Sequence, residues 1–240
     1  RILVTGGARG IGAAIVATLA THGATGAVLD LHPDETGQSP WPNVAVDVTD
    51  DDAMRDATRA LIDADGPFDG LVVAAGIVPS WHSPADVDLD SFDRTMAVNT
   101  RGLVVALKNV VASMPPGSTV VAIGSLNSWR GDPNLLSYAA SKHAVLGIVR
   151  SAAMALGPQG IRVNAVAPGP VATGALLERI EARAATTHRS RDEALQASAD
   201  LTALGTLASV DNVASAVLFL TSTLSAATTG HLLPVDGGLL

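Results

Sequence analysis

The chain has 240 residues, of which 48% are hydrophobic and 16% charged, and it carries a net charge of −8. This composition is typical of a folded protein with a large buried core and excludes an intrinsically disordered chain. The negative charge and the 3% of aromatic residues argue against nucleic acid as a partner. No run reaches about 18 consecutive apolar residues, so no membrane-spanning helix is expected. The chain lacks cysteine, which fits a cytoplasmic protein.

Short apolar segments alternate along the chain with segments whose apolar residues recur at helical spacing. The first residues, RILVTGG, already read as a strand, so we expect a segment to be missing before Arg1 and no signal peptide. This alternation predicts an α/β protein: one Rossmann domain over residues 1–240, with a doubly wound parallel sheet of about seven strands and helices on both faces. The expected strands are residues 2–5, 27–30, 44–46, 71–75, 119–123, 162–167 and 232–235, and the expected helices are residues 11–21, 51–64, 89–111, 137–156 and 210–221.

Two segments depart from this alternation. Residues 31–43, LHPDETGQSPWPN, contain three prolines, so a helix there is expected to be missing or stunted. The segment from about residue 174 to residue 204 is rich in alanine, threonine and charged residues and leads directly into no strand. We expect it to form a helical flap that covers the substrate.

A glycine-rich turn, TGGARGIG at residues 5–12, joins the first expected strand to the first expected helix. Its glycines permit positive φ, bring the backbone close to a pyrophosphate and let the helix pack tightly on the strand. The N-terminus of that helix offers free N–H groups to the phosphates. A purely structural turn is the alternative, but the strand before it and the helix after it favour a dinucleotide site. The residues expected to contact the cofactor here are Gly6, Arg9, Gly10, Ile11 and Gly12.

Asp30 ends the second expected strand, eighteen residues after Gly12. A carboxylate there can accept hydrogen bonds from the adenosine ribose and would repel the 2′-phosphate of NADP. Between Gly10 and Met54 there is no lysine or arginine, which leaves Arg9 as the one cation near the turn. We therefore predict NAD as the cofactor, against the alternative that Asp30 only caps a turn.

A second carboxylate follows the third expected strand in the segment VDVTD. Asp47, next to Val48, is placed to contact the adenine edge of the cofactor, and equally to act as the N-cap of the next helix. The residues alone favour neither role over the other.

The segment SYAASKHAV, residues 137–145, contains the only tyrosine, Tyr138, and one of the two lysines, Lys142. Four residues apart on a helix, the two side chains share one face. A free phenol has a pKa of about 10, too high to lose its proton readily at neutral pH, and a nearby cation lowers that pKa. Lys142 could supply the cation and also hold the nicotinamide ribose. The pair therefore predicts proton transfer at a substrate oxygen, against the alternative of a chance pairing on a helix surface.

Two further polar residues could complete such a site. Ser125 follows the expected strand 119–123 and precedes Tyr138 by thirteen residues. It could orient the substrate oxygen, or merely form a turn at the strand end. Asn99 could hold a water molecule in a proton relay, whereas taken alone it is better explained as a polar surface residue.

The order and spacing of seven short motifs resemble those of the classical short-chain dehydrogenase/reductase family across essentially the whole chain. These motifs are TGGARGIG (5–12), AAG (74–76), AVN (97–99), GS (124–125), YAASK (138–142), RVNAVAPGPVAT (162–173) and PVDGG (234–238). The resemblance implies an NAD(P)-dependent alcohol dehydrogenase or ketoreductase and a homotetramer whose contacts include the C-terminal end. It also implies a catalytic tetrad of Asn99, Ser125, Tyr138 and Lys142, and cofactor contacts from Ala75, Gly76, Pro168, Gly169, Val171 and Thr173.

One position departs from the family pattern. Members usually carry an asparagine just before AG, where this chain has Val73 and Ala74 in LVVAAG. In relatives that asparagine chiefly tethers the central sheet, so we expect altered packing here and no loss of activity.

The candidate substrate contacts are mainly apolar and include no arginine cluster, which indicates a small, neutral alcohol or ketone. Trp81 is explained equally well by packing of a surface loop, and the histidines lack the spacing of a metal site, so no metal is expected. We expect NAD-dependent interconversion of a secondary alcohol and a ketone, with Tyr138 as general acid and base. The alternatives are a 3-oxoacyl thioester reductase and a catalytically silent NAD-binding regulator. The expected substrate contacts are Trp81, Ser125, Asn127, Pro170 and Leu177.

Overall fold

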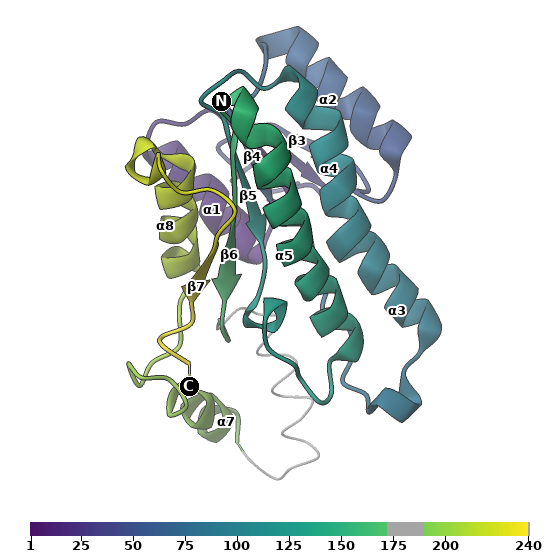
Figure 1. Cartoon of the computed structure of the whole chain (residues 1–240), viewed down its shortest axis with the longest axis vertical. Helices are drawn as coiled ribbons and strands as arrows, with labels where there is room; N and C mark the ends of the chain where they lie inside the picture. Colours follow the sequence, from purple (N-terminus) through teal and green to yellow (C-terminus); the bar gives the residue numbers. More distant parts are fainter. Residues whose placement is uncertain (172–189, 240) are drawn as a thin grey trace.

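A computed structural model describes residues 1–171 and 190–239 of the chain, and of Arg191 it describes the backbone alone. Within these ranges seven parallel strands form one sheet in the order β3-β2-β1-β4-β5-β6-β7 (Figure 1). The order reverses between β1 and β4, and ligands of such sheets bind beyond the carboxyl ends of the strands at that point. The strands are β1 (Ile2–Thr5), β2 (Gly26–Asp30), β3 (Asn43–Ala45), β4 (Gly70–Val73), β5 (Thr119–Ile123), β6 (Arg162–Pro168) and β7 (Leu232–Val235).

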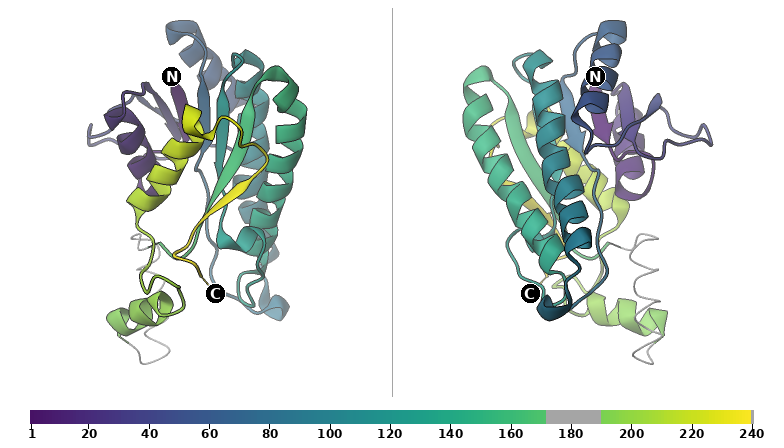
Figure 2. Two further views of the ribbon diagram at one scale, coloured as in Figure 1. Left: turned by 60° about the vertical axis from the view of Figure 1, so that its left-hand side comes forward. Right: turned by 90° about the vertical axis from the view of Figure 1, so that its right-hand side faces the viewer.

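Helices cover both faces of the sheet (Figure 2). On one face, α1 (Gly10–Thr21) and α8 (Val210–Thr221) pack against each other. On the other face lie α2 (Asp51–Asp65), α4 (Gly102–Val110) and α5 (Leu136–Leu156). The predicted α/β fold with a doubly wound parallel sheet is therefore confirmed.

Alternate residues of the central strands contribute to two separate apolar cores. In β1, Leu3 packs toward α2, α4 and α5, whereas Ile2 and Val4 pack toward α1 and α8. In β4, Leu71 belongs to the first core and Val72 to the second. This is the two-residue period of a strand that is buried on both faces. It explains why the sequence of these strands is apolar throughout.

The strands and helices begin and end within two residues of their predicted positions, with one exception. The single long helix predicted at residues 89–111 is wrong, because α3 (Leu89–Met96) is followed by a π-helical turn, η2 (Ala97–Arg101), and then by α4. Apolar residues recur at helical spacing in α3 and again in α4. Because a π turn adds only about one residue to the helix, this spacing does not show where the turn lies. The turn carries Asn99 into the interior of the protein.

Residues 31–42, between β2 and β3, contain no helix, as predicted from their prolines. None of the helices within the described ranges is both long enough and apolar enough to cross a membrane. The short 3-10 turns are η1 (Pro84–Asp86), η3 (Val111–Ser113), η4 (Leu126–Ser128), η5 (Gly157–Gln159) and η6 (Thr223–Ser225).

Helix α7 (Arg191–Ala199) is the described helical part of the predicted flap, and residues 174–189 of that flap lie outside the described residues. It begins with a capping box, in which Ser190 Oγ accepts from the N–H of Glu193 (3.2 Å) and the Ser190 N–H donates to the Glu193 carboxylate (2.7 Å). α7 lies beyond the carboxyl ends of β6 and β7 (Figures 1 and 2). The chain after α7 pairs with the C-terminal segment through the Ala203 N–H and the Gly238 carbonyl oxygen (2.9 Å).

Candidate active site

The glycine-rich turn brings β1, α1 and the end of β4 together by backbone contacts. A Cβ atom at Gly12 would lie 1.9 Å from the carbonyl oxygen of Gly6, and one at Gly6 would lie 2.5 Å from the backbone of Ala75. Gly6 also has a φ of 70°, which residues with side chains rarely adopt. The start of α1 is therefore held against the turn at a distance that only glycine allows.

The N-terminus of α1 carries backbone donors that the side chain of its N-cap residue does not cap. Its N-cap is Arg9, whose exposed side chain makes no capping hydrogen bond. Gly10 and Ile11 are the first helical residues, and the N–H groups of this first turn carry the positive end of the helix dipole. With the close backbone approach at Gly12, these uncapped donors fit the pyrophosphate of a dinucleotide.

Asp30 is buried at the end of β2, where two backbone N–H groups hold its carboxylate. Oδ2 accepts from the N–H of Ala8 in the glycine-rich turn (3.0 Å), and Oδ1 accepts from the N–H of His32 (3.0 Å). A carboxylate offers about four lone-pair sites, so acceptor capacity remains for a ribose hydroxyl. The two predicted roles of Asp30, turn cap and ribose acceptor, are therefore compatible in one geometry.

Asp47 is exposed beyond the end of β3, and its Oδ1 accepts from the N–H and the Oγ1 of Thr49 (both 2.8 Å). The N-cap of α2 is Asp50, whose carboxylate accepts from the second and third helical N–H groups (3.0 Å). The alternative that Asp47 caps this helix is therefore wrong, because the helix begins three residues too late. The neighbouring Val48 is buried in the core beneath α4.

Tyr138 and Lys142 lie one turn apart in α5, with Nζ of Lys142 at 5.6 Å from the centre of the Tyr138 ring. The amine donates to the carbonyl oxygen of Ile123 at the end of β5 (2.8 Å). Lys142 is only 5% exposed, and burial lowers its pKa to about 8 because water no longer stabilises the charged form. The structure therefore brings the predicted pair together, with a buried cation beside a half-buried phenol.

Ser125 begins the turn η4 immediately beyond β5 and is buried. Its Oγ accepts from the backbone N–H of Asn127 (3.2 Å), and its own N–H donates to the Oγ of Ser128 (3.2 Å). This reciprocal capping fixes the Ser125 hydroxyl two residues beyond Ile123, whose carbonyl oxygen receives the Lys142 amine. Ser125 does form a strand-end turn, and that turn places its hydroxyl at the carboxyl end of the sheet.

Asn127 is buried beside Ser125, with its Oδ1 at 3.4 Å from the Ser125 Oγ. Its amide nitrogen has no hydrogen-bond partner among the described residues. A buried N–H group without a partner costs roughly 1–3 kcal/mol, and such groups are rare in folded proteins unless they serve a site.

Asn99 is 3% exposed, so the alternative that it is a polar surface residue is wrong. Its Oδ1 accepts from the N–H of Ile77 (2.8 Å), and its Nδ2 donates to the Ile77 carbonyl oxygen (2.9 Å) and to the Oγ of Ser141 (3.0 Å). Asn99 thereby joins the loop after β4 to α5. Both amide hydrogens are occupied, which leaves acceptor capacity on Oδ1 for a water molecule.

Gly76 marks the point at which these side chains converge. A Cβ atom there would lie 3.3 Å from Oδ1 of Asn99 and 3.7 Å from Nζ of Lys142. The residue before it, Ala75, contacts the glycine-rich turn at Gly6. The catalytic candidates and the dinucleotide candidates therefore form one continuous site.

The exit from β6 lies against the end of β7. The Gly169 N–H donates to the Val235 carbonyl oxygen (3.0 Å), and a Cβ at Gly169 would lie 2.8 Å from the Cβ of Asp236. Val171 is buried and pairs with Ala208 in an isolated bridge. Pro168 and Pro170 belong to this exit, whereas Thr173 and Leu177 lie outside the described residues.

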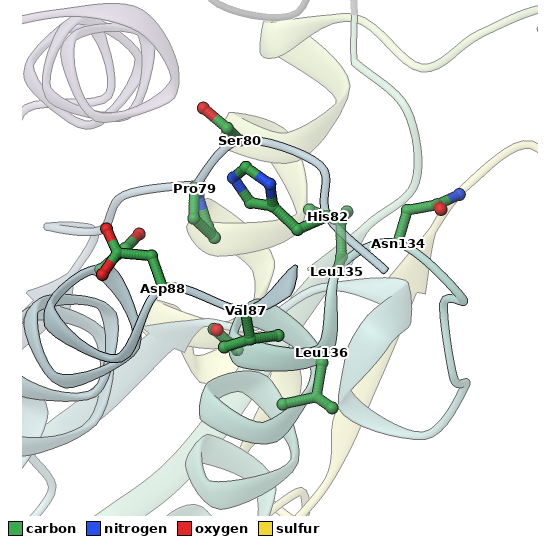
Figure 3. Close-up of a pocket in the computed structure, with 10 residues that line it drawn as sticks. Pro79, Ser80, His82, Val87, Asp88, Asn134, Leu135 and Leu136 are labelled. Atoms are coloured by element: carbon green, nitrogen blue, oxygen red, sulfur yellow. The ribbon is translucent and has the colours of Figure 1, made fainter. Parts of the chain in front are cut away.

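Trp81 is half-buried in the loop that follows β4. Its sequence neighbours Ser80 and His82 line a small cavity (Figure 3). The cavity lies between Pro79, Ser80 and His82 on one side and Asn134–Ser137 on the other. A hydrogen bond from the His82 N–H to the Asn134 carbonyl oxygen (3.0 Å) joins the two segments. The cavity volume of about 10 Å³ holds one water molecule at most, which is too small for an alcohol or ketone. The cavity is also not lined by the predicted substrate contacts that the structure describes, namely Trp81, Ser125, Asn127 and Pro170.

Two residues that contact Asn99 were not predicted from the sequence. Ser141 lies within YAASK, three residues after Tyr138, and helical spacing could have placed it on the face that carries the tyrosine. Ile77 contributes only backbone atoms, so no sequence signal could have identified it. In the part of the chain that the structure describes, no three His, Asp or Glu side chains lie close enough together to hold a metal ion.

The whole chain is similar to known proteins in sequence and in structure. A family profile described as "Enoyl-(Acyl carrier protein) reductase" matches residues 6–240. Short-chain dehydrogenase reductase 5 from Arabidopsis thaliana is 38% identical over 99% of this chain and 93% of its own. (+)-Borneol dehydrogenase 2 from Salvia officinalis is 34% identical over 98% of this chain and 87% of its own. The solved structure of an NAD⁺-bound xylitol dehydrogenase has a TM-score of 0.90 and 25% identity, covering 99% of this chain and 97% of the other.

Proposed function

This chain belongs to the short-chain dehydrogenase/reductase family of oxidoreductases, and we propose that it interconverts a secondary alcohol and a ketone with NAD, using Tyr138 as general acid and base. The observation that carries the proposal is the buried amine of Lys142, 5.6 Å from the centre of the Tyr138 ring. Even with its pKa lowered to about 8, Lys142 is protonated at neutral pH. It supplies the positive charge that a phenolate needs.

In oxidation, the alcohol loses a proton from its oxygen and a hydride from its carbon, and it becomes a ketone. The Tyr138 phenolate takes the proton, and Ser125 Oγ donates a hydrogen bond that orients the substrate oxygen. NAD, when bound, supplies the acceptor for the hydride. A water molecule held by Asn99 near Lys142 carries the proton onward to solvent. In reduction, Tyr138 returns the proton to the same oxygen.

The close backbone packing at Gly12 and the uncapped start of α1 support a dinucleotide as cofactor. In this proposal Asp30 binds the adenosine ribose, and Asp47 and Val48 contact the adenine. The nicotinamide ribose is held by Tyr138 and Lys142. The remaining assigned contacts are Gly6, Arg9, Gly10, Ile11, Ala75, Gly76, Pro168, Gly169, Val171 and Thr173.

The preference for NAD over NADP rests on the buried carboxylate of Asp30. Unit charges ~4 Å apart in a partly screened site interact by roughly 4 kcal/mol, so a 2′-phosphate there is strongly disfavoured. We expect the kcat/KM with NAD to exceed that with NADP by at least tenfold (about 1.4 kcal/mol). Asp30→Ser should remove the preference, and the exposed Glu35→Ala should not. A wild-type protein that prefers NADP would contradict this assignment.

We propose a small, neutral substrate. The candidate contacts are Trp81, Ser125, Asn127, Pro170 and Leu177, with the segment from about residue 174 to residue 204 as a flap over it. The names of the borneol and xylitol dehydrogenases that resemble this chain denote alcohols as substrates, which supports this class.

A reductase of 3-oxoacyl thioesters is the second candidate. One observation favours it, namely that the matching family profile is described as a reductase of an acyl-carrier-protein substrate. An acidic carrier protein requires a basic docking surface, whereas this chain has a net charge of −8. A catalytically silent NAD-binding regulator is the remaining alternative, and the presence of Ser125, Tyr138 and Lys142 in one site argues against it.

We further propose that the protein acts as a single-domain homotetramer in the cytoplasm. An apolar groove of about 540 Å³ runs between α4 and α5 on the outer surface, and Val104 at its edge is 47% exposed. Burying such a surface against a second copy would remove apolar area from water. The residues that line the groove are Val104, Leu107, Ala144, Gly147, Ile148, Ser151, Ala152 and Ala155.

A panel of secondary alcohols and diols with NAD tests the proposed activity, with the absorbance of the reduced cofactor as the readout. An acetoacetyl thioester with NADPH tests the second candidate in parallel. The Tyr138→Phe protein should retain NAD binding in calorimetry, because the other cofactor contacts remain, and lose turnover. Undiminished turnover in that variant would falsify the proposed mechanism, and NAD binding without turnover of any compound would favour the regulator.

A further inference from the structure

Ser141 is completely buried in α5, three residues after Tyr138 and directly before Lys142. Its hydroxyl donates to the backbone carbonyl oxygen of Tyr138 (2.8 Å) and accepts from Nδ2 of Asn99 (3.0 Å). A serine hydroxyl has one hydrogen to donate, and here that hydrogen is committed to Tyr138. The hydroxyl therefore links the turn that carries the catalytic candidates of α5 to the side chain of Asn99.

The other end of this link is the loop that follows β4. The amide of Asn99 pairs with both backbone groups of Ile77, accepting at 2.8 Å and donating at 2.9 Å. Ile77 directly follows Gly76, whose Cβ position would lie within 4 Å of both Asn99 Oδ1 and Lys142 Nζ. A continuous chain of hydrogen bonds thus runs from Ile77 through Asn99 and Ser141 to Tyr138.

We propose that Ser141 is a positioning residue for the proposed oxidoreductase reaction, whose hydroxyl sets the orientation of Asn99 and the distance between the loop at Gly76 and the Tyr138–Lys142 turn of α5. This inference rests on the proposed function. Without the hydroxyl, one N–H of Asn99 is left buried and unpaired, at a free-energy cost that a shift of the Asn99 side chain towards another acceptor would relieve. Any such movement shifts Ile77 and Gly76, which lie beside the Lys142 amine.

The separation between the Lys142 amine and the Tyr138 phenol decides how strongly the cation favours the phenolate. Ser141 therefore acts on the phenol through the geometry of its neighbours, without touching the substrate. Because Tyr138 is the only tyrosine in the chain, the absorbance of tyrosinate during a pH titration reports on this phenol alone. That readout requires no turnover and would not change if Ser141 served packing alone.

The test compares the wild type with Ser141→Ala and Ser141→Cys, each with saturating NAD. The thiol is somewhat larger than the hydroxyl, so it leaves no cavity, and it is a weak hydrogen-bonding group; both variants should therefore behave alike. We expect the titration midpoint of Tyr138 to rise and kcat/KM to fall by about tenfold, the factor expected when one buried donor loses its partner. The affinity for NAD, measured by calorimetry, should change by less than kcat/KM does.

Ser113→Ala is the matched control. Ser113 Oγ donates to the carbonyl oxygen of Val110, three residues earlier, at 2.8 Å, the same geometry as in the bond from Ser141 to Tyr138. It lies in η3, directly after α4, and is not among the described hydrogen-bond partners of Asn99, so its loss should leave the phenol titration and kcat/KM unchanged. Circular dichroism and thermal unfolding establish that each variant is folded before it is assayed.

The proposal is overturned if Ser141→Ala leaves both the phenol titration and kcat/KM at the wild-type values, or if Ser141→Cys restores both. It is also overturned if Ser113→Ala produces the same losses. Should Ser141→Ala fail to fold, Ser141→Cys alone decides, because wild-type values in that variant rule out a role for the hydroxyl. A wild-type protein that turns over no alcohol refutes the proposed function, and the NAD-dependent titration of Tyr138 still reports on Ser141.

Discussion

The two ends of the β-sheet differ in how completely certain buried polar groups are hydrogen-bonded. At the amino end, the Arg162 guanidinium donates to the carbonyl oxygens of Leu220 (3.1 Å) and Ser222 (3.0 Å) and so satisfies the last turn of α8. At the carboxyl end, Oγ1 of Thr5 and Nδ2 of Asn127 have no partner among the described residues. The proposed active site lies at the end where these groups are left unpaired.

The same contrast holds for the charged groups. Partial burial lowers the pKa of Arg162, but four hydrogen bonds to backbone and serine oxygens surround its guanidinium. Burial lowers the pKa of Lys142 as well, and its amine donates to one backbone carbonyl oxygen, that of Ile123. The amino end therefore stabilises the fold, whereas the carboxyl end keeps polar groups available for a ligand at a cost in stability. Four substitutions and one pH series can break or sharpen this contrast.

Lys142→Met should produce the largest effect. Loss of the cation beside Tyr138 should lower kcat/KM by ~10²–10⁴, the range associated with general acid–base catalysis. The same change should raise the free energy of unfolding at pH 7, since an apolar side chain replaces a buried charge. Kinetics with NAD and urea denaturation measure the two effects. Lys108→Met, which alters the other lysine, on the exposed face of α4, is the control; equal activity of both variants would refute the contrast.

The pH dependence of stability should follow the buried amine. Lys142 has a pKa of about 8 in the folded chain, against 10.5 for an ordinary lysine, so between these values the unfolded chain binds a proton that the folded chain has released. The free energy of unfolding should therefore rise across this window, by about 3 kcal/mol in total, because the cost of the buried charge disappears. Below pH 8 that cost is present in full. Urea denaturation at several pH values should show this rise in the wild type relative to Lys142→Met, and parallel curves would contradict it.

Arg162→Met should act on stability alone. Removing the guanidinium leaves the carbonyl oxygens at the end of α8 without donors, which should lower the free energy of unfolding by about 2 kcal/mol. For a chain of this size the melting temperature should fall by roughly 4–8 °C. The kcat/KM measured well below that temperature should stay within about twofold of the wild type. The exposed Arg150→Met serves as the control, and a large loss of activity in Arg162→Met would break the contrast.

Thr5→Val and Ser225→Ala should have the smallest effects, with opposite signs. The Thr5 hydroxyl is buried without a partner in the described structure, so its removal should raise the free energy of unfolding by about 1 kcal/mol. The Ser225 hydroxyl accepts from Arg162 (2.8 Å) and donates to Leu220 (3.0 Å), so its removal should lower that free energy by about 1 kcal/mol. Chemical denaturation measures both effects. A destabilised Thr5→Val protein would show that the Thr5 hydroxyl at the carboxyl end does form a hydrogen bond.

The elements and the local pairs followed from the sequence because they depend on short-range spacing. Leu71 and Val72 pack into the two different apolar cores because neighbouring side chains of a strand point to opposite faces of the sheet. Tyr138 and Lys142 meet because four residues make about one helical turn. Each of these contacts is fixed by the repeat of one element, so the pattern of the sequence contains it.

Contacts between distant segments could not be predicted in the same way. Asn99 and Ser141 are 42 residues apart, and they meet only because a π turn points Asn99 inward. Apolar periodicity does not reveal such a turn. The choice between Asp47 and Asp50 as N-cap depended on a helix boundary, which patterns locate only to within a few residues. The predicted roles of residues 172–189 stay predictions.

The π turn also sets the rotational phase of α4. A π turn holds about one residue more than an α-helical turn, so Ala97–Arg101 accommodates one extra residue while α4 keeps its phase relative to α3. If the same residues formed an uninterrupted α-helix, every later side chain of α4 would rotate by about 100° around the helix axis. Leu103, Ala106 and Val110, which face the core, would then turn away from the sheet. Deleting a single residue from this segment would instead leave these three side chains in the core and change the position of Asn99 alone, so such deletions should survive selection for folding and be lost under selection for catalysis.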